Sequence, residues 1–181
     1  LYSIILLFPL RRCYYMFALG SCDLFAHLSC AQQIINTGNI ETYYPIAQIL
    51  LAELQIAGIS LDNAALFIPG FLSILYILYL FILGSSLQNY PRISLLSLIF
   101  GLPLLYTMFH YSFHPYIYAL FFIPLYFYLI FGSIKSPKKG RYKILILILS
   151  FMIVFFHPLI VLILILFLIG AFVVNLTFNY P

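Results

Sequence analysis

The sequence predicts an all-α, polytopic transmembrane protein. Of its 181 residues, 65% are hydrophobic and only 7% are charged, and the mean hydropathy is +1.14. Eight Lys or Arg and four Asp or Glu are too few to solvate a globular domain of this size, and intrinsic disorder requires the opposite composition. Apolar runs separated by short polar turns then predict membrane-spanning helices, each of which needs roughly 20 residues.

Five largely apolar runs are the candidate spans. We expect the last two to be separate tilted helices, because proline disfavours α geometry in the residue before it and the two runs together are too long for one span. The turn between them is His157-Pro158. The runs cover residues 65–84, 93–109, 116–132, 144–156 and 159–174.

The remaining residues form one short apolar stretch and one polar segment. We interpret residues 1–10 as the end of a truncated first transmembrane helix, residues 11–63 as an external loop, and residues 64–178 as the five spans. The chain is therefore expected to be a fragment, from the N-terminal part of a longer polytopic protein.

The basic residues predict the orientation. They cluster in the turn after residues 116–132, and Arg92 follows residues 65–84, so both turns are expected to be cytoplasmic. The polar segment and the turns at 110–115 and 157–158 then fall on the external side. All acids and histidines of the chain lie there, which is typical of a site at a membrane boundary: Asp23, Glu41, Glu53, Asp62, His27, His110, His114 and His157.

Two interfacial amphipathic helices are expected in the external loop. Residues 22–37 lie between a good N-cap, Ser21, and a helix-stopping Gly38, and Leu24, Leu28, Ala31 and Ile35 repeat at helical spacing. Residues 46–56 place an apolar stripe on one face, with polar side chains off the stripe. The expected stripe is Ile46, Ile49, Leu50 and Leu54, and the residues off it are Gln48, Glu53 and Gln55.

Asp23 and His27 are four residues apart on the first of these helices. That spacing places a carboxylate and an imidazole on one face, within reach of one metal ion or one substrate group. The alternative is a capping Asp at a helix N-terminus and an unrelated surface His. The helix dipole favours an ionised Asp23 in either case.

Three further features are candidate substrate contacts. Arg11 and Arg12, at the start of the external loop, suit forked hydrogen bonds to a phosphate headgroup, and ordinary snorkelling to phospholipid is the alternative. Tyr43 and Tyr44 are either headgroup-level aromatics or the wall of a sugar or lipid-phosphate site. The tripeptide Phe-His-Pro occurs at 113–115 and again at 156–158, as a duplicated helical hairpin or as chance in a Phe-rich chain.

Several site classes have no motif here. The three cysteines (Cys13, Cys22 and Cys30) have no CxxC spacing, so zinc is not indicated, although an external Cys13–Cys22 bridge is possible. The sequence has no Gly-rich phosphate loop, no nucleophile elbow, no zinc-protease motif and no basic stripe for nucleic acid.

Part of this segment resembles a known loop. It consists of the run Asp23-Leu24-Phe25-Ala26-His27-Leu28, a helix to Gly38 and then Tyr44-Pro45. It is similar to the first external loop of the GT-C class of polytopic glycosyltransferases, which use polyprenyl-phosphate sugars. Archaeal oligosaccharyltransferase catalytic subunits have a similar Asp-x-x-x-His-Leu run followed by a Gly and a Tyr-Pro. The resemblance covers residues 11–84, and the later helices match only in hydropathy.

The resemblance implies roles for particular residues. Asp23 would act at the active site as base, orienting group or metal ligand, with His27 beside it and Glu41 as the reserve catalytic acid. A divalent ion, Mg²⁺ or Mn²⁺, is the implied cofactor. The second acidic motif of oligosaccharyltransferases is replaced here by His110-Tyr111-Ser112-Phe113-His114-Pro115, and their C-terminal acceptor-recognition domain is absent, so monosaccharide transfer is expected and not oligosaccharide transfer to asparagine.

The sequence therefore predicts a multi-pass cell-membrane glycosyltransferase that moves a sugar from a polyprenyl-phosphate donor in the lipid to an unidentified acceptor, with no nucleic-acid partner. A polytopic transporter and a non-catalytic membrane assembly subunit are the alternatives. Transport sites need buried polar groups on broken helices near the midplane, whereas these spans are mostly Leu, Ile and Phe. Gly70, Gly101, Pro103 and Pro124 are the positions at which spans could break.

The predicted transferase has these expected substrate contacts: Arg11, Arg12, Tyr43, Tyr44, His110, His114 and His157.

Overall fold

The computed structural model describes residues 22–43, 45–87, 91–105, 113–135 and 139–178, and all regular structure within these ranges is α-helical. This confirms the predicted all-α class. The predicted truncated helix at 1–10 and the first half of the predicted turn at 110–115 lie outside the described ranges. In chain order the helices are α2 (Cys22–Thr37), α3 (Ile46–Ile56), α4 (Leu61–Leu87), α5 (Pro91–Leu105), α6 (Pro115–Phe121), α7 (Ile123–Lys135), α8 (Lys139–Phe156) and α9 (Pro158–Phe178).

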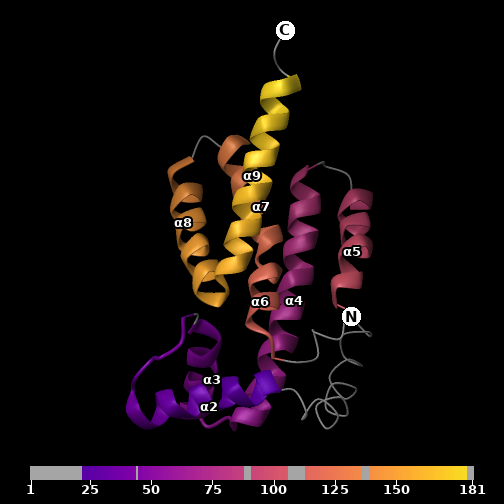
Figure 1. Cartoon of the computed structure of the whole chain (residues 1–181). Coiled ribbons are helices and arrows are strands. Elements are labelled where there is room, and N and C mark those ends of the chain that lie inside the picture. Colours follow the sequence, from indigo (N-terminus) through magenta and orange to yellow (C-terminus); the bar gives the residue numbers. More distant parts are fainter. Residues whose placement is uncertain (1–21, 44, 88–90, 106–112, 136–138, 179–181) are drawn as a thin grey trace.

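The helices form a bundle with a cap at one end. Helices α4 to α9 run roughly along a common axis, and α2 and α3 lie across the end at which α4, α6 and α9 begin (Figure 1). Two helical stretches in the described part are long and apolar enough to cross a membrane, Leu61–Leu87 and Pro115–Ile134. Their length and composition weakly indicate membrane association.

The bundle helices follow the predicted apolar runs, and several begin or end a few residues beyond them. Helix α5 is described to Leu105, and the end of the run predicted at 93–109 lies outside the described residues. Helix α8 starts at Lys139, five residues before the predicted run at 144, because polar residues are compatible with helix geometry outside the apolar stretch. Helices α8 and α9 are separate, as predicted. The His157 N–H still donates to the Ile153 carbonyl at 2.9 Å, and Pro158 then starts α9 because proline suits the first helical position.

The predicted run at 116–132 is interrupted at Phe122, where a turn divides α6 from α7. Pro124 is the cause, because it has no N–H to donate to the carbonyl four residues earlier and its ring crowds that carbonyl. At the turn itself, the Phe122 N–H donates to the Ala119 carbonyl, three residues earlier, at 3.3 Å. Helix α4 continues through Gly70 and α5 through Gly101 and Pro103, so these three positions break no helix.

The two cap helices have the predicted bounds. Gly38 ends α2 with a φ of +72°, which an L side chain rarely adopts, and its N–H donates to the Ile34 carbonyl at 2.8 Å. Leu24 and Ala31 are buried, as the helical spacing predicts. The loop then continues to α3 at Ile46.

The buried face of α3 differs from the predicted apolar stripe. Leu50, expected on that stripe, is exposed, whereas Gln48, expected off it, is 1% exposed. Gln48 can be buried because its amide has a hydrogen-bond partner on α2, which hydropathy alone does not reveal. The buried residues of the helix are Ala47, Gln48, Leu51 and Ala52.

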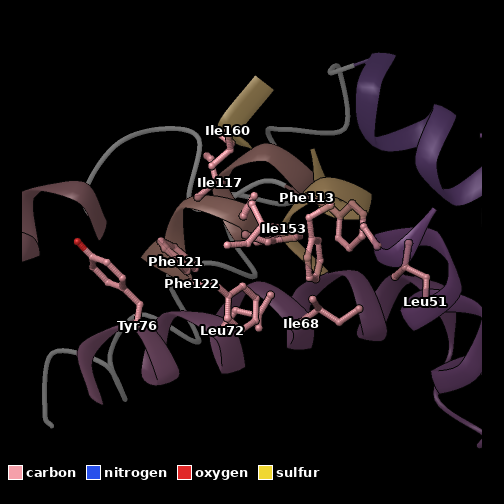
Figure 2. Packing of buried hydrophobic residues seen from close by; sticks show 14 of the residues in the cluster. Leu51, Ile68, Leu72, Tyr76, Phe113, Ile117, Phe121, Phe122, Ile153 and Ile160 are labelled. Atoms are coloured by element: carbon pink, nitrogen blue, oxygen red, sulfur yellow. The ribbon is translucent and has the colours of Figure 1, made fainter. Parts of the chain in front are cut away.

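One hydrophobic core joins the bundle to the cap. Figure 2 shows Ile68, Leu72 and Tyr76 of α4 on the side of the helix that faces α6. The Tyr76 ring stacks on Phe121, with ring centroids 4.9 Å apart, and Leu51 of α3 belongs to the same cluster. The core therefore fixes the position of the cap relative to the bundle.

Small residues bring α4 and α5 close together. A Cβ atom on Gly84 would lie 2.8 Å from the Ser94 Cα and 2.7 Å from the Ser97 Oγ, and the Ser85 and Ser94 hydroxyls are hydrogen-bonded at 2.8 Å. Small side chains and hydroxyl pairs are the usual means of close helix packing in an apolar medium.

Candidate functional site

Charged residues and histidines are divided between the two ends of the bundle. One end of the bundle is made by α2, α3, residues 38–43 and the starts of α4, α6 and α9 (Figure 1). We call it the polar end. In the described ranges it carries His27, His114 and His157 with Asp23, Glu41, Glu53 and Asp62. The described basic residues lie at the opposite end, at the start of α5, the end of α7 and the start of α8: Arg92, Lys135, Lys139, Arg141 and Lys143.

His27 and Gln48 connect the two cap helices. The Gln48 Nε2 lies 2.7 Å from the His27 Nδ1, although the residues are 21 positions apart. This contact joins α2 to α3. An amide carries both a donor and an acceptor, so it can pair with either neutral tautomer of the imidazole.

Phe113 holds the same imidazole from the bundle side. Its ring meets the His27 ring edge-on, with centroids 5.6 Å apart and an interplanar angle of 61°, and Phe113 is 1% exposed. Gln48 of α3 and Phe113, two residues before α6, thus both contact one side chain of α2.

The expected metal ligands, Asp23 and His27, lie one helical turn apart on α2. The described residues contain no group of three His, Cys, Asp or Glu that could hold a metal ion. A divalent ion at this pair stays a prediction.

The two Phe-His-Pro tripeptides meet in the structure. Phe113 and Phe156 both contact Tyr118 edge-on, with centroid distances of 5.4 and 6.3 Å. His114 and His157 both contact Tyr116, at 5.7 and 6.0 Å. In each tripeptide the His lies outside a helix and the Pro begins one, α6 or α9. The repeat therefore builds one aromatic cluster at the polar end.

The other predicted site residues are more dispersed. Asp23 lies in the first turn of α2, one turn before His27. Glu41 is exposed, and Tyr43 is 94% exposed, so the loop presents them to the surroundings. Arg11, Arg12, Tyr44 and His110 lie outside the described residues. Gln48 was not among the predicted site residues, and the sequence does not distinguish it from Glu53 and Gln55, the other polar residues of α3.

His157, a histidine of this aromatic cluster, has a shifted pKa. Partial burial lowers its pKa below the ordinary value of 6.5, because burial disfavours the imidazolium. Its neutral form therefore contributes stability that is present above pH 6.5. This stability is lost as the pH falls through the lower folded-state pKa, because the unfolded chain then binds more protons.

We expect acidification from pH 7.5 to pH 5 to lower the melting temperature of the wild-type protein more than that of His157→Gln, which cannot titrate. Thermal unfolding in detergent, followed by circular dichroism at both pH values, measures the difference. Equal acid-induced shifts in the two proteins would show that His157 is not the group responsible.

Comparisons with protein-family models, with curated proteins and with solved structures give no match to this chain.

Proposed function

We propose that this chain is a multi-pass integral membrane protein that transfers a monosaccharide from a polyprenyl-phosphate donor to an acceptor at its polar end, which faces outward. The observation that carries the proposal is the division of charge along the bundle. Every described basic residue lies at one end, and every described acid and histidine lies at the other. By the positive-inside rule the basic end is cytoplasmic.

The outer surface of α8 and α9 supports insertion in lipid. Large apolar side chains there are more than half exposed, including Leu147, Phe151, Leu166 and Phe167. So many exposed large apolar side chains on two helices are unusual on a soluble monomer and ordinary on helices surrounded by lipid. We infer that α4, α5, α6–α7, α8 and α9 all cross the bilayer, and that α2 and α3 lie at the external interface.

Asp23 is the proposed catalytic base. It takes the proton of an acceptor hydroxyl, and the acceptor oxygen forms a bond to the anomeric carbon of the sugar. The bond from that carbon to the phosphate oxygen breaks, and polyprenyl phosphate leaves with the electron pair. Charge on the leaving phosphate needs cationic groups or hydrogen-bond donors, and we assign this role to Arg11 and Arg12 together with the histidines of the polar end.

The membrane-spanning helices support a transferase better than a transporter. Among the described residues, the fully buried polar side chains are Gln48 and Ser94. Gln48 belongs to the cap, and Ser94 is hydrogen-bonded to Ser85 between α4 and α5. A transport path would require buried polar groups near the middle of the bundle, and no charged side chain of the described ranges is among the fully buried ones.

The full chain, reconstituted in liposomes that contain a polyprenyl-phosphate hexose with a radiolabelled sugar, tests the proposal. We expect the label to move from the lipid fraction to a water-soluble or protein-bound product. Glu53→Gln, which changes an exposed acid on α3, is the control and should behave as wild type. Retention of all label in the lipid with both glucose- and mannose-linked donors would refute the proposal.

A further inference from the structure

Positive charge is concentrated where α7 ends and α8 begins. Lys135 is the last residue of α7, and Lys139, Arg141 and Lys143 lie near the start of α8. The sequence has no Asp or Glu after Asp62, and the acids of the described ranges lie at the polar end. The described part of the chain therefore supplies no counter-charge for these cations.

A close contact between α7 and α8 determines how the start of α8 is turned. A Cβ atom on Gly132 of α7 would lie 2.9 Å from the Tyr142 Cζ, so the Tyr142 ring lies directly against the α7 backbone. Successive residues of an α-helix are about 100° apart around its axis, which places Arg141 and Lys143 on the two sides of this contact. Both of these residues are exposed.

Each of the two exposed cations has apolar side chains on its own face of α8, toward the middle of the bundle. Leu145 follows Arg141 by one helical turn and is 49% exposed. Leu147 follows Lys143 by one turn, Phe151 follows Leu147 by another, and they are 59% and 58% exposed. Residues four apart lie on the same face of a helix. A cation at the head of an exposed apolar strip is complementary to a lipid with an anionic headgroup.

We propose that the start of α8 is a binding site for anionic phospholipid, with headgroup phosphates at Arg141 and Lys143 and acyl chains along the apolar strips of α8. Basic clusters next to a membrane-spanning helix attract anionic headgroups, and a guanidinium can bond two phosphate oxygens at once. A soluble anion or an acidic peptide would use the cations and leave the strips uncovered. The inference rests on the membrane insertion in the proposed function and does not depend on sugar transfer.

The lipid preference of the purified full chain tests the site. The chain in a non-ionic detergent is mixed with equal amounts of phosphatidylglycerol and phosphatidylcholine that have the same acyl chains, and native mass spectrometry gives the ratio of the two lipids that stay bound. The wild-type chain should retain mainly phosphatidylglycerol. Arg141→Gln and Lys143→Gln should each lower the ratio by about fivefold, and the double variant by about 25-fold, the effect expected for one or two cations at a lipid surface.

Two control variants separate this site from a general effect of positive charge. Arg92→Gln removes an exposed cation from the same end of the bundle, and since Arg92 is the single basic residue of α5, the ratio should stay close to wild type. Lys143→Arg keeps the charge and should retain the preference. The two single Gln variants keep one of the two cations each, so they decide the result if the double variant fails to fold.

Three results would overturn the proposal. The first is a wild-type chain without preference for phosphatidylglycerol, or folded Gln variants at positions 141 and 143 that keep it. The second is a loss in Arg92→Gln as large as that in Lys143→Gln, which would indicate attraction to the whole basic end. The third is displacement of phosphatidylglycerol by inorganic phosphate but not by chloride of equal ionic strength, which would indicate a site for free anions. A chain that shows the preference but transfers no sugar would refute the transferase and leave the lipid site standing.

Discussion

Replacing Asp23 by Asn is expected to lower sugar transfer by on the order of a hundredfold or more, the range associated with loss of a general base. Asn has the size of Asp and caps a helix N-terminus equally well. Since Asp23 lies in the first turn of α2, expression, membrane insertion and thermal stability should remain close to wild type. The rate of label release from a polyprenyl-phosphate hexose in liposomes measures the effect.

Glu41→Gln is the matched comparison, because it neutralises the reserve acid in the exposed loop after α2. We expect this variant to keep most of the transfer activity. Full activity in Asp23→Asn together with loss in Glu41→Gln would move the catalytic carboxylate to Glu41. Full activity in both variants would remove the mechanism proposed for either acid.

Gly84→Leu is expected to cause the largest loss of stability among single changes in the bundle. Even a Cβ atom at this position would lie 2.8 Å from the Ser94 Cα, which is backbone and cannot rotate away. Overpacking of this kind typically costs about 1–3 kcal/mol, and separating the helices would also weaken the Ser85–Ser94 hydrogen bond. Thermal unfolding in detergent measures the change.

Gly170→Leu is the control for that substitution, because a Cβ atom at Gly170 of α9 meets nothing within 4 Å. It adds the same side chain to an open helix surface and should leave the melting temperature nearly unchanged. Equal melting temperatures for Gly84→Leu and wild type would show that the close approach of α4 and α5 does not limit stability.

Local signals in the sequence predicted the helices well. The bounds of α2 and α3 follow from a helix stop at Gly38 and from an apolar stretch that begins after Pro45. The separation of α8 from α9 follows from the His157-Pro158 step. These features depend on neighbours in the chain, which explains why periodicity and cap residues were sufficient.

Contacts between distant segments could not be predicted in this way. Gln48 appeared to lie off the apolar face of α3, and its burial depends on a partner 21 residues earlier. The repeated Phe-His-Pro tripeptides were visible in the sequence, but only the folded chain shows that both contact Tyr116 and Tyr118. The break at Phe122 required a choice among four Gly or Pro positions that sequence alone does not rank.

The central claim is that the polar end faces outward and the basic end faces the cytoplasm. Ala57→Cys, after α3, and Gly140→Cys, near the start of α8, probe the two ends at exposed positions, in a chain with Cys13, Cys22 and Cys30 changed to Ser. With a membrane-impermeant maleimide on intact cells, we predict that the Ala57→Cys chain is labelled without permeabilisation and the Gly140→Cys chain only after it. Labelling of both variants from the same side, or the reverse pattern, would contradict the account.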